Sequence, residues 1–389
     1  MSARLETDVD DGVLDKVLIF SLYRCEGVNL GVSLSTTDMI TFPDDAPIMH
    51  NHGTYHGVGA SFCLPSAGKI QASAHKYFIL HCFLFHLFST FAVMTYEDMW
   101  RCLATIYGER EARAIARTVL EMRFGWTATD VLTCKDKHLC GKDKAECEKM
   151  MGRLMAYEPV QYVLGKADFC GREFFVDRNV LIPRPETEEL CTMIVEREQA
   201  QPKVRAASWG SQNEVDGCMP DLSILDVCTG SGCIAITLAL CLPGAKVHAT
   251  DMYDEVLDTS KRNARALGAD VLFSKQDALA MPCEECLWDV IVSNPPYVCE
   301  SERSEMGKNV LGYEPHEALF VPDDAPLIFY KAIAKYARKA LKSGGRLYFE
   351  INPVHACSLV AMLESMRFCD ITLHDDIYGK QRFCTCNNF

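Results

Sequence analysis

Residues Asn294-Pro295-Pro296-Tyr297 combine groups that could bind an amide or amino nitrogen. Asn294 has a side-chain carbonyl acceptor, and Pro295 has a main-chain carbonyl acceptor. Two acceptors at hydrogen-bonding distance from one point suit a planar NH2 group, which has two N–H donors. Tyr297 adds a flat face for packing against a planar group. The motif therefore predicts a clamp for a nitrogen that is about to be alkylated. A proline-rich turn after a core strand is the alternative interpretation.

The clamp follows Val290-Ile291-Val292, a short apolar run of β-branched residues. Such a run predicts a buried strand of a parallel sheet. Pro295 and Pro296 lack an N–H donor, so the strand must end before them. This places Asn294 at the carboxyl end of a strand, where open α/β sheets bind their ligands.

A second strand, Ile224 to Val227, runs into the loop Cys228-Thr229-Gly230-Ser231-Gly232 and then into an apolar helix at 234–242. Glycines allow the backbone to approach a ligand closely, and the helix presents its positive end to that ligand. The loop resembles a dinucleotide-binding turn but lacks the longer phosphate fingerprint.

Asp251 ends the next predicted strand, 247–251, and an acid at this place typically binds both ribose hydroxyls of an adenosine. A ribose acid without the full phosphate fingerprint favours a nucleoside cofactor that has no pyrophosphate, namely S-adenosylmethionine. Asp277 and Ala278 follow the third strand, and we expect Asp277 beside the adenine amino group.

The composition is that of a soluble globular protein with about two domains: 389 residues, 49% hydrophobic and 24% charged. The net charge of −14 argues against a large surface for nucleic acid. The 20 cysteines have no regular spacing and many lie in apolar segments, which predicts buried, reduced thiols in a cytoplasmic protein. Cys283 and Cys286 have the spacing of half a zinc site, but no second Cys-x-x-Cys completes it, so we expect no metal.

Residues 1–93 differ from the rest of the chain and form an atypical extension. The apolar run Tyr77 to Val93 is too short and too interrupted for a membrane span, and no cleavage motif marks a secretory signal. We therefore expect a poorly packed extension. A sharper hypothesis is that Met94 is the natural start and that a misplaced initiation codon precedes it.

Three further regions follow. Residues 94–165 have apolar side chains at helical spacing, with the last helix at Cys147 to Tyr157, and predict a small helical bundle for binding a partner. Residues 166–183 alternate around Gly171, which indicates a β-hairpin linker. Residues 184–389 alternate between strands and helices and predict an α/β domain with a doubly wound, mostly parallel sheet and an antiparallel edge.

Three connecting segments have separate predictions. Residues 199–221 are polar and predict a surface loop, and residues 313–319 suggest a lid. Arg184 and Glu186 lie in the segment before the first helix of the α/β domain. They belong to an interdomain connector or to the edge of the active site.

The run Ile182-Pro183-Arg184-Pro185-Glu186-Thr187-Glu188, the glycine loop and the clamp together resemble the release factor glutamine methyltransferase family (the PrmC/HemK group) over about residues 94–389. The resemblance implies a class I S-adenosylmethionine-dependent methyltransferase with an N-terminal helical domain that helps to bind a release factor. It also implies methylation of the side-chain nitrogen (N5) of the glutamine in the Gly-Gly-Gln loop of class 1 peptide chain release factors. No direct contact with nucleic acid or membrane is expected.

The resemblance assigns roles to particular residues. The cofactor set is Asp226, Cys228, Thr229, Gly230, Ser231, Gly232, Asp251, Asp277, Ala278 and Asn294. The substrate set is Asn294, Pro295, Pro296 and Tyr297, with Asn294, Pro295 and Tyr297 as the catalytic group. Arg184 and Glu186 join the substrate set through their predicted place at the edge of the active site, apart from the resemblance. Two departures affect local geometry: Cys228 stands where glycine is frequent, and Glu350-Ile351-Asn352 stands where many members have Glu-x-Gly.

An amide nitrogen is a poor nucleophile, so hydrogen bonds from its N–H groups to Asn294 and Pro295 would aim it and return electron density to it. Two alternatives remain open. An amino-group methyltransferase of nucleic acid would need the same clamp, but the acidic charge and the lack of a Lys/Arg-rich arm disfavour it. An inactive cofactor-binding scaffold is disfavoured by the intact Asn294, Asp251 and Gly230.

Overall fold

The computed structural model describes residues 93–133, 138–200 and 222–389, together with four short strands nearer the N-terminus. These strands form two antiparallel pairs, β1 (Leu18–Leu22) with β2 (Leu30–Leu34) and β3 (Thr54–Gly57) with β4 (Ala60–Cys63). They belong to a unit, Met1–Phe78, that is separate from the unit Ile79–Phe389. The apolar run before Val93 lies outside the described residues, and the origin of residues 1–93 remains a prediction. The loop predicted at 199–221 begins too early, because residues 199 and 200 are the end of a helix, and its remaining residues, 201–221, lie outside the described residues.

The helical region after Met94 forms a small bundle with its own core. Its elements are β5 (Val93–Met94), α2 (Tyr96–Leu103), α3 (Glu109–Phe124), α4 (Ala128–Thr133), β6 (Leu139–Cys140), α5 (Gly141–Met155) and α6 (Val160–Leu164). Leu103, Leu120 and Leu154 are fully buried in this core. Helix α5 begins six residues before the predicted Cys147, because its charged first turn gives no apolar periodicity.

The predicted hairpin consists of β7 (Lys166–Phe169) and β8 (Arg172–Phe175). Its turn residues Cys170 and Gly171 both have left-handed backbone, with φ of 48° and 68°, as a two-residue type I′ turn requires. Phe169 and Phe174 pack edge to face and are buried in the same core as the helices of the α/β domain. The hairpin therefore contributes to the core of that domain.

Asn263 joins the hairpin to the glycine loop. Its side chain is fully buried, and its Oδ1 accepts a hydrogen bond from the Phe175 N–H at 2.7 Å. Its Nδ2 donates to the carbonyl oxygens of Phe175 and Ser231 at 3.0 and 2.8 Å. One amide thus satisfies main-chain groups from two separate segments.

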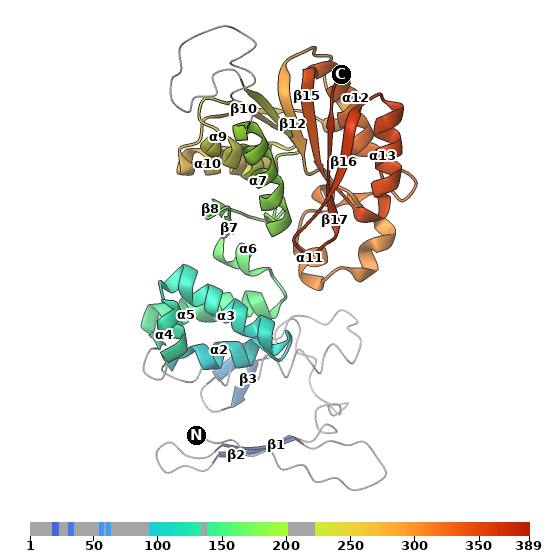
Figure 1. Cartoon of the computed structure of the whole chain (residues 1–389). Helices are drawn as coiled ribbons and strands as arrows, with labels where there is room; N and C mark the ends of the chain where they lie inside the picture. Colours follow the sequence, from blue (N-terminus) through green and yellow to red (C-terminus); the bar gives the residue numbers. More distant parts are fainter. Residues whose placement is uncertain are drawn as a thin grey trace. The chain divides into compact units, whose positions relative to one another are not determined.

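The α/β domain contains a seven-stranded sheet (Figure 1). In spatial order its strands are β11 (Val271–Lys275), β10 (Lys246–Asp251), β9 (Ser223–Val227), β12 (Trp288–Ser293), β15 (Leu341–Glu350), β17 (Gln381–Asn387) and β16 (Cys369–Asp375). The first five strands are parallel, and β17 runs antiparallel to both of its neighbours. The predicted doubly wound, mostly parallel sheet is confirmed, and its strand order reverses between β9 and β12, where such folds bind ligands.

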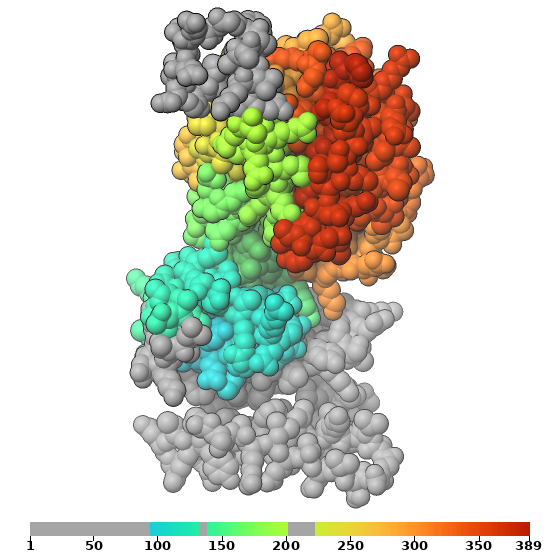
Figure 2. All heavy atoms as spheres, viewed as in Figure 1, coloured from blue at the N-terminus to red at the C-terminus, as the bar shows by residue number. Residues whose placement is uncertain are grey.

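Helices cover both faces of the sheet (Figure 1). They are α7 (Pro185–Ala200), α9 (Cys233–Cys241) and α10 (Asp254–Leu267) on one face, and α12 (Ile328–Ala340) and α13 (Ala356–Ser365) on the other. Shorter elements follow the strand ends: η1 (Ala278–Ala280), β13 (Val298–Cys299), η2 (Glu300–Glu305), α11 (Lys308–Tyr313), η3 (His316–Ala318), β14 (Phe320–Val321) and η4 (Pro353–His355). The part of the chain coloured orange to red in Figure 2 forms one continuous surface of this domain.

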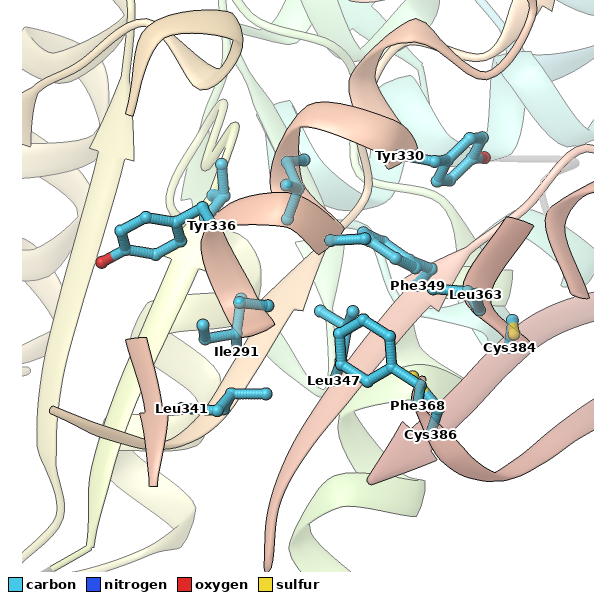
Figure 3. Packing of buried hydrophobic residues seen from close by; sticks show 14 of the residues in the cluster. Ile291, Tyr330, Tyr336, Leu341, Leu347, Phe349, Leu363, Phe368, Cys384 and Cys386 are labelled. Atoms are coloured by element: carbon cyan, nitrogen blue, oxygen red, sulfur yellow. The ribbon is translucent and has the colours of Figure 1, made fainter. Parts of the chain in front are cut away.

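Strand β15 shows how the two faces are filled. Leu347 and Phe349 point into the core shared with α12 and α13 (Figure 3), whereas Tyr348 between them lies in the opposite core. Strand β12 alternates in the same way, with Ile291 on the α12 side. Burial on both faces explains why these strands are continuous apolar runs in the sequence. No helix among the described residues is long and apolar enough to cross a membrane.

Candidate active site

A cavity of about 380 Å³ lies at the carboxyl ends of β9, β10, β11 and β12. Both Asp251, the predicted ribose acid, and Asn294, from the clamp, line this one space. The predicted residues Cys228, Thr229, Gly230, Ser231, Asp277, Ala278, Pro296 and Arg184 also line it. The size of the cavity falls within the range of small-molecule sites. The fold therefore brings most of the predicted site residues together.

The glycine loop turns through three residues with left-handed backbone: Cys228, Gly230 and Gly232, with φ of 62°, 56° and 82°. A Cβ at Gly232 would lie 2.9 Å from Ile236 Cδ1 and 3.0 Å from Ser260 Cβ, so only glycine fits between α9 and α10. Gly232 does not itself line the cavity. At Cys228 a side chain adopts this backbone at a cost of about 1–2 kcal/mol, which glycine would avoid.

Asp226 supports the loop from behind. Its carboxylate is fully buried, accepts hydrogen bonds from Thr229 Oγ1 at 2.6 Å and from the Ala235 N–H at 3.3 Å, and does not line the cavity. Burial raises the pKa of Asp226 to about 7, although the hydrogen bonds oppose this effect. The residue thus fixes the shape of the loop, whereas the sequence placed it among the cofactor contacts.

Asp251 is held at the cavity by the main chain. Its Oδ2 accepts from the Gly230 N–H at 3.1 Å, and its Oδ1 accepts from the Met252 N–H at 2.8 Å. Burial raises the pKa of Asp251, and these hydrogen bonds work against the rise. Asp277 accepts from the Leu279 N–H at 2.8 Å and begins η1 beside the same cavity. Two carboxylates are therefore fixed where a nucleoside could meet them.

Asn294 is oriented by a chain of hydrogen bonds. Its Nδ2 donates to Thr187 Oγ1 at 3.3 Å, and Thr187 Oγ1 donates to Glu350 Oε2 at 2.6 Å. A hydroxyl has one hydrogen, and Thr187 gives it to Glu350, so Thr187 can only accept from Asn294. This arrangement holds the NH2 end of the amide against Thr187 and leaves the Oδ1 acceptor available at the cavity.

Glu350 anchors the clamp from the far side. It is almost fully buried, and its Oε1 accepts a hydrogen bond from the Tyr297 hydroxyl at 3.1 Å. Burial raises the pKa of Glu350, and the hydrogen bonds from Thr187 and Tyr297 counteract that rise. The Glu350 carboxylate thus holds both ends of the clamp motif, Tyr297 directly and Asn294 through Thr187.

Asn294 and Pro296 line the cavity, whereas the other two members of the clamp, Pro295 and Tyr297, do not. Tyr297 packs partly buried against the core on the α12 side and does not line the cavity, so its ring does not offer the free flat face that the sequence predicted. Pro295 is buried and also lies outside the lining.

Arg184 ties the predicted lid to the cavity. Its Nη2 lies 2.6 Å from Glu314 Oε1, and Glu314 is buried. Pro315 and Glu317, which follow in the same segment, line the cavity. Glu186 lies in the first turn of α7 and does not line it. The segment 313–319 thus lies at the site, as a lid would. Of Arg184 and Glu186, only Arg184 lines the cavity.

The sequence does not predict Thr187, Glu314 or Glu350 as polar contacts of this site, although Glu314 lies within the predicted lid segment. Glu350 belongs to the run Glu350-Ile351-Asn352, in which Asn352, not Glu350, departs from the family pattern. All three polar residues are at most 4% exposed. A carboxylate at the end of an apolar strand was the available signal for Glu350, because buried charges need partners. Its partners are 163 and 53 residues away in sequence, so only the fold identifies them.

A methyltransferase small domain model matches residues 216–312, and a PrmC N-terminal domain model matches residues 101–165. A release factor glutamine methyltransferase of Bacteroides thetaiotaomicron is 41% identical over 286 residues, which cover 73% of this chain and 96% of that protein. One of Flavobacterium psychrophilum is 39% identical over 287 residues, covering 74% and 95%.

Among solved structures, a ribosomal protein L11 methylase of Lactobacillus delbrueckii matches with a TM-score of 0.35 and 20% identity over 55% of this chain and 82% of that one. The fold, the glycine loop and the matched domain define a class I S-adenosylmethionine-dependent methyltransferase. Within that class, the chain belongs to the release factor glutamine methyltransferase family.

Proposed function

We propose that this chain transfers a methyl group from S-adenosylmethionine to the side-chain amide nitrogen of the glutamine in the Gly-Gly-Gln loop of class 1 release factors. The observation that supports this most directly is the single cavity shared by Asp251 and Asn294, with the Asn294 amide held so that its oxygen is available. A substrate NH2 group needs that acceptor. The names of the relatives supply the identity of the substrate.

The cofactor fits the residues that are present. The left-handed glycine loop brings main-chain atoms to the cavity, Asp251 offers a carboxylate for ribose hydroxyls, and Asp277 offers one for the adenine amino group. When bound, S-adenosylmethionine supplies an electrophilic methyl carbon on its sulfonium. All of these groups lie at the carboxyl ends of neighbouring parallel strands or just after them, and the strands hold them in fixed relation.

The residues of the chain would act by binding and orientation. The substrate NH2 group donates a hydrogen bond to Asn294 Oδ1, whereas Pro295 lies outside the cavity lining and is not assigned this role. The bond to Asn294 directs the nitrogen lone pair and favours the charge that develops as the nitrogen is alkylated. Pro315 and Glu317 lie over the same cavity and would restrict water.

The helical bundle would bind the body of the release factor. The match of residues 101–165 to the PrmC N-terminal domain supports this role. The Tyr313 hydroxyl, at the end of α11 beside the lid, donates a hydrogen bond to the Ala156 carbonyl oxygen of the bundle at 2.7 Å. A protein that docks on the bundle could therefore change the position of the lid through this hydrogen bond.

The proposal is tested with labelled S-adenosylmethionine and four acceptors: a release factor, the same factor with the loop glutamine changed to alanine, RNA and DNA. We expect label on the unmodified factor alone. Label on RNA or DNA would support an amino-group methyltransferase of nucleic acid instead. Cofactor binding without label on any acceptor would support the inactive scaffold.

A further inference from the structure

Three side chains with metal-binding atoms meet just beyond the clamp. Cys299, Glu302 and His355 each offer one ligand atom, and these atoms all lie within 4.8 Å of one another. Cys299 Sγ is 3.3 Å from His355 Nε2. We propose that these three residues form a binding site for a zinc-type divalent ion, with a fourth position left for water.

The ligand types select the ion. A thiolate, an imidazole and a carboxylate are the ligands that Zn²⁺ takes in proteins, whereas Mg²⁺ and Ca²⁺ prefer oxygen alone. Sulfur at 2.3 Å and nitrogen at 2.0–2.1 Å from a tetrahedral ion lie about 3.5 Å apart. The observed separation of Cys299 and His355 needs only a small adjustment to reach that value.

The carboxylate is already held in place. Glu302 Oε2 accepts from the Cys299 N–H at 2.7 Å and from Asn352 Nδ2 at 2.9 Å. Asn352 is itself fixed, because its Oδ1 accepts from the Val354 N–H at 3.0 Å. A carboxylate has about four lone-pair sites, so these two donors leave capacity for an ion. Such supporting contacts are typical of metal ligands.

The surroundings favour a cation. Cys299 is buried at 5% exposure, and Glu302 and His355 are half-buried, so the site is shielded but can be entered. Asp323 lies nearby and binds the N–H and hydroxyl of Ser301. Two carboxylates close to one thiol raise the local affinity for a positive ion.

An ion here would cross-link two strand ends. Cys299 lies two residues after Tyr297, and His355 lies five residues after Glu350. Asn352 already links the two segments, because its Nδ2 also donates to the Tyr297 carbonyl oxygen at 3.2 Å. Bound metal would therefore stabilise the folded state by mass action. It takes no part in methyl transfer, so the site and the proposed function stand or fall separately.

The test uses the full chain, reduced, stripped with a chelator and titrated with Zn²⁺ or Co²⁺. We expect about one ion per chain, a thiolate-to-cobalt absorption band and a rise in melting temperature on adding Zn²⁺. Cys299→Ser and Glu302→Gln should each weaken binding at least about tenfold, the lower limit for loss of a supporting contact alone. The matched control is Cys283→Ser/Cys286→Ser, which removes an exposed Cys-x-x-Cys pair and should bind like the parent.

Three results would overturn the proposal. The first is unchanged metal uptake and cobalt absorption in Cys299→Ser, and the second is the loss of both in Cys283→Ser/Cys286→Ser. The third is an equal rise in the melting temperature of the parent and of Cys299→Ser on adding Zn²⁺, because the ion then binds elsewhere. Melting temperatures of the metal-free proteins show whether each variant is folded, and Glu302→Gln keeps a side-chain oxygen that can accept from the Cys299 N–H.

Discussion

Replacing Thr187 by valine removes the hydroxyl that orients Asn294 while keeping a β-branched side chain in the buried first turn of α7. The hydrogen bond from Asn294 to Thr187 is worth about 1 kcal/mol, which favours the productive amide orientation about fivefold over the flipped one. Without it the two orientations become nearly equal, and the productive fraction falls by about half. If the bond strengthens to about 1.4 kcal/mol in the transition state, its loss lowers kcat by up to about tenfold.

We therefore expect Thr187→Val to lower kcat between about twofold and tenfold, with cofactor affinity changed less than about twofold. The assay is transfer of labelled methyl to an unmodified release factor at saturating cofactor, with cofactor affinity measured by calorimetry. Thr187→Ser is the matched control, because it keeps the hydroxyl and should retain most of the activity. Equal losses in the valine and serine variants would refute the orientation mechanism, as would an unchanged kcat in Thr187→Val.

Three further predictions follow from the site. Asn294→Ala should lower kcat at least about 100-fold with an unchanged circular dichroism spectrum; near-normal transfer would contradict the clamp. Because burial raises the pKa of Asp226 to about 7, the folded state keeps a proton that the unfolded state loses from about pH 4, so this group costs stability as pH rises between those values. Denaturation at pH 5 and pH 8 should show the parent losing up to about 3 kcal/mol relative to Asp226→Asn, and equal pH dependence would count against the assignment. Gly230→Ala, with open space at its Cβ, should cost about 1–2 kcal/mol of backbone strain, and Gly232→Ala should cost the same strain plus about 1–3 kcal/mol through contact with Ser260; a reversed order in urea denaturation would be evidence against the packing explanation.

The sheet and the positions of its strand ends could be predicted from the sequence because their signals are local. An apolar run that ends at Asn294 and two prolines fixes a strand end within a few residues. Asp251 is identified in the same way, by a carboxylate directly after a β-rich run. These signals were enough to gather Asp251, Asn294 and the glycine loop at one edge of one sheet.

The hydrogen bonds that orient the clamp could not be predicted, because they join residues that are distant in sequence. Thr187 and Glu350 are 163 residues apart, and no sequence motif around either residue indicates the other as its partner. The direction of side chains was also out of reach. Asp226 and Asp251 are both acids at strand ends, yet one faces the interior and the other the cavity.

The side chains of the proposed metal site could not be predicted from the sequence either. Cys283 and Cys286 have the spacing of half a zinc site, but both are exposed, and no group of metal-binding side chains among the described residues includes them. Cys299 and His355 are 56 residues apart and have no motif. Spacing identifies ligands on one turn or one hairpin, whereas ligands from separate strand ends need coordinates.

Asn263 has a consequence for dissecting the protein into fragments. Truncation at Arg184 would delete the strand that this buried amide bonds and would strip Phe169 and Phe174 from the interior. In such a fragment the Asn263 carboxamide would lose its bonds to the Phe175 main chain, and the core would contain a cavity the size of two aromatic rings. A shortened catalytic unit must therefore start no later than Lys166, and the hairpin should be counted with the piece that does the chemistry.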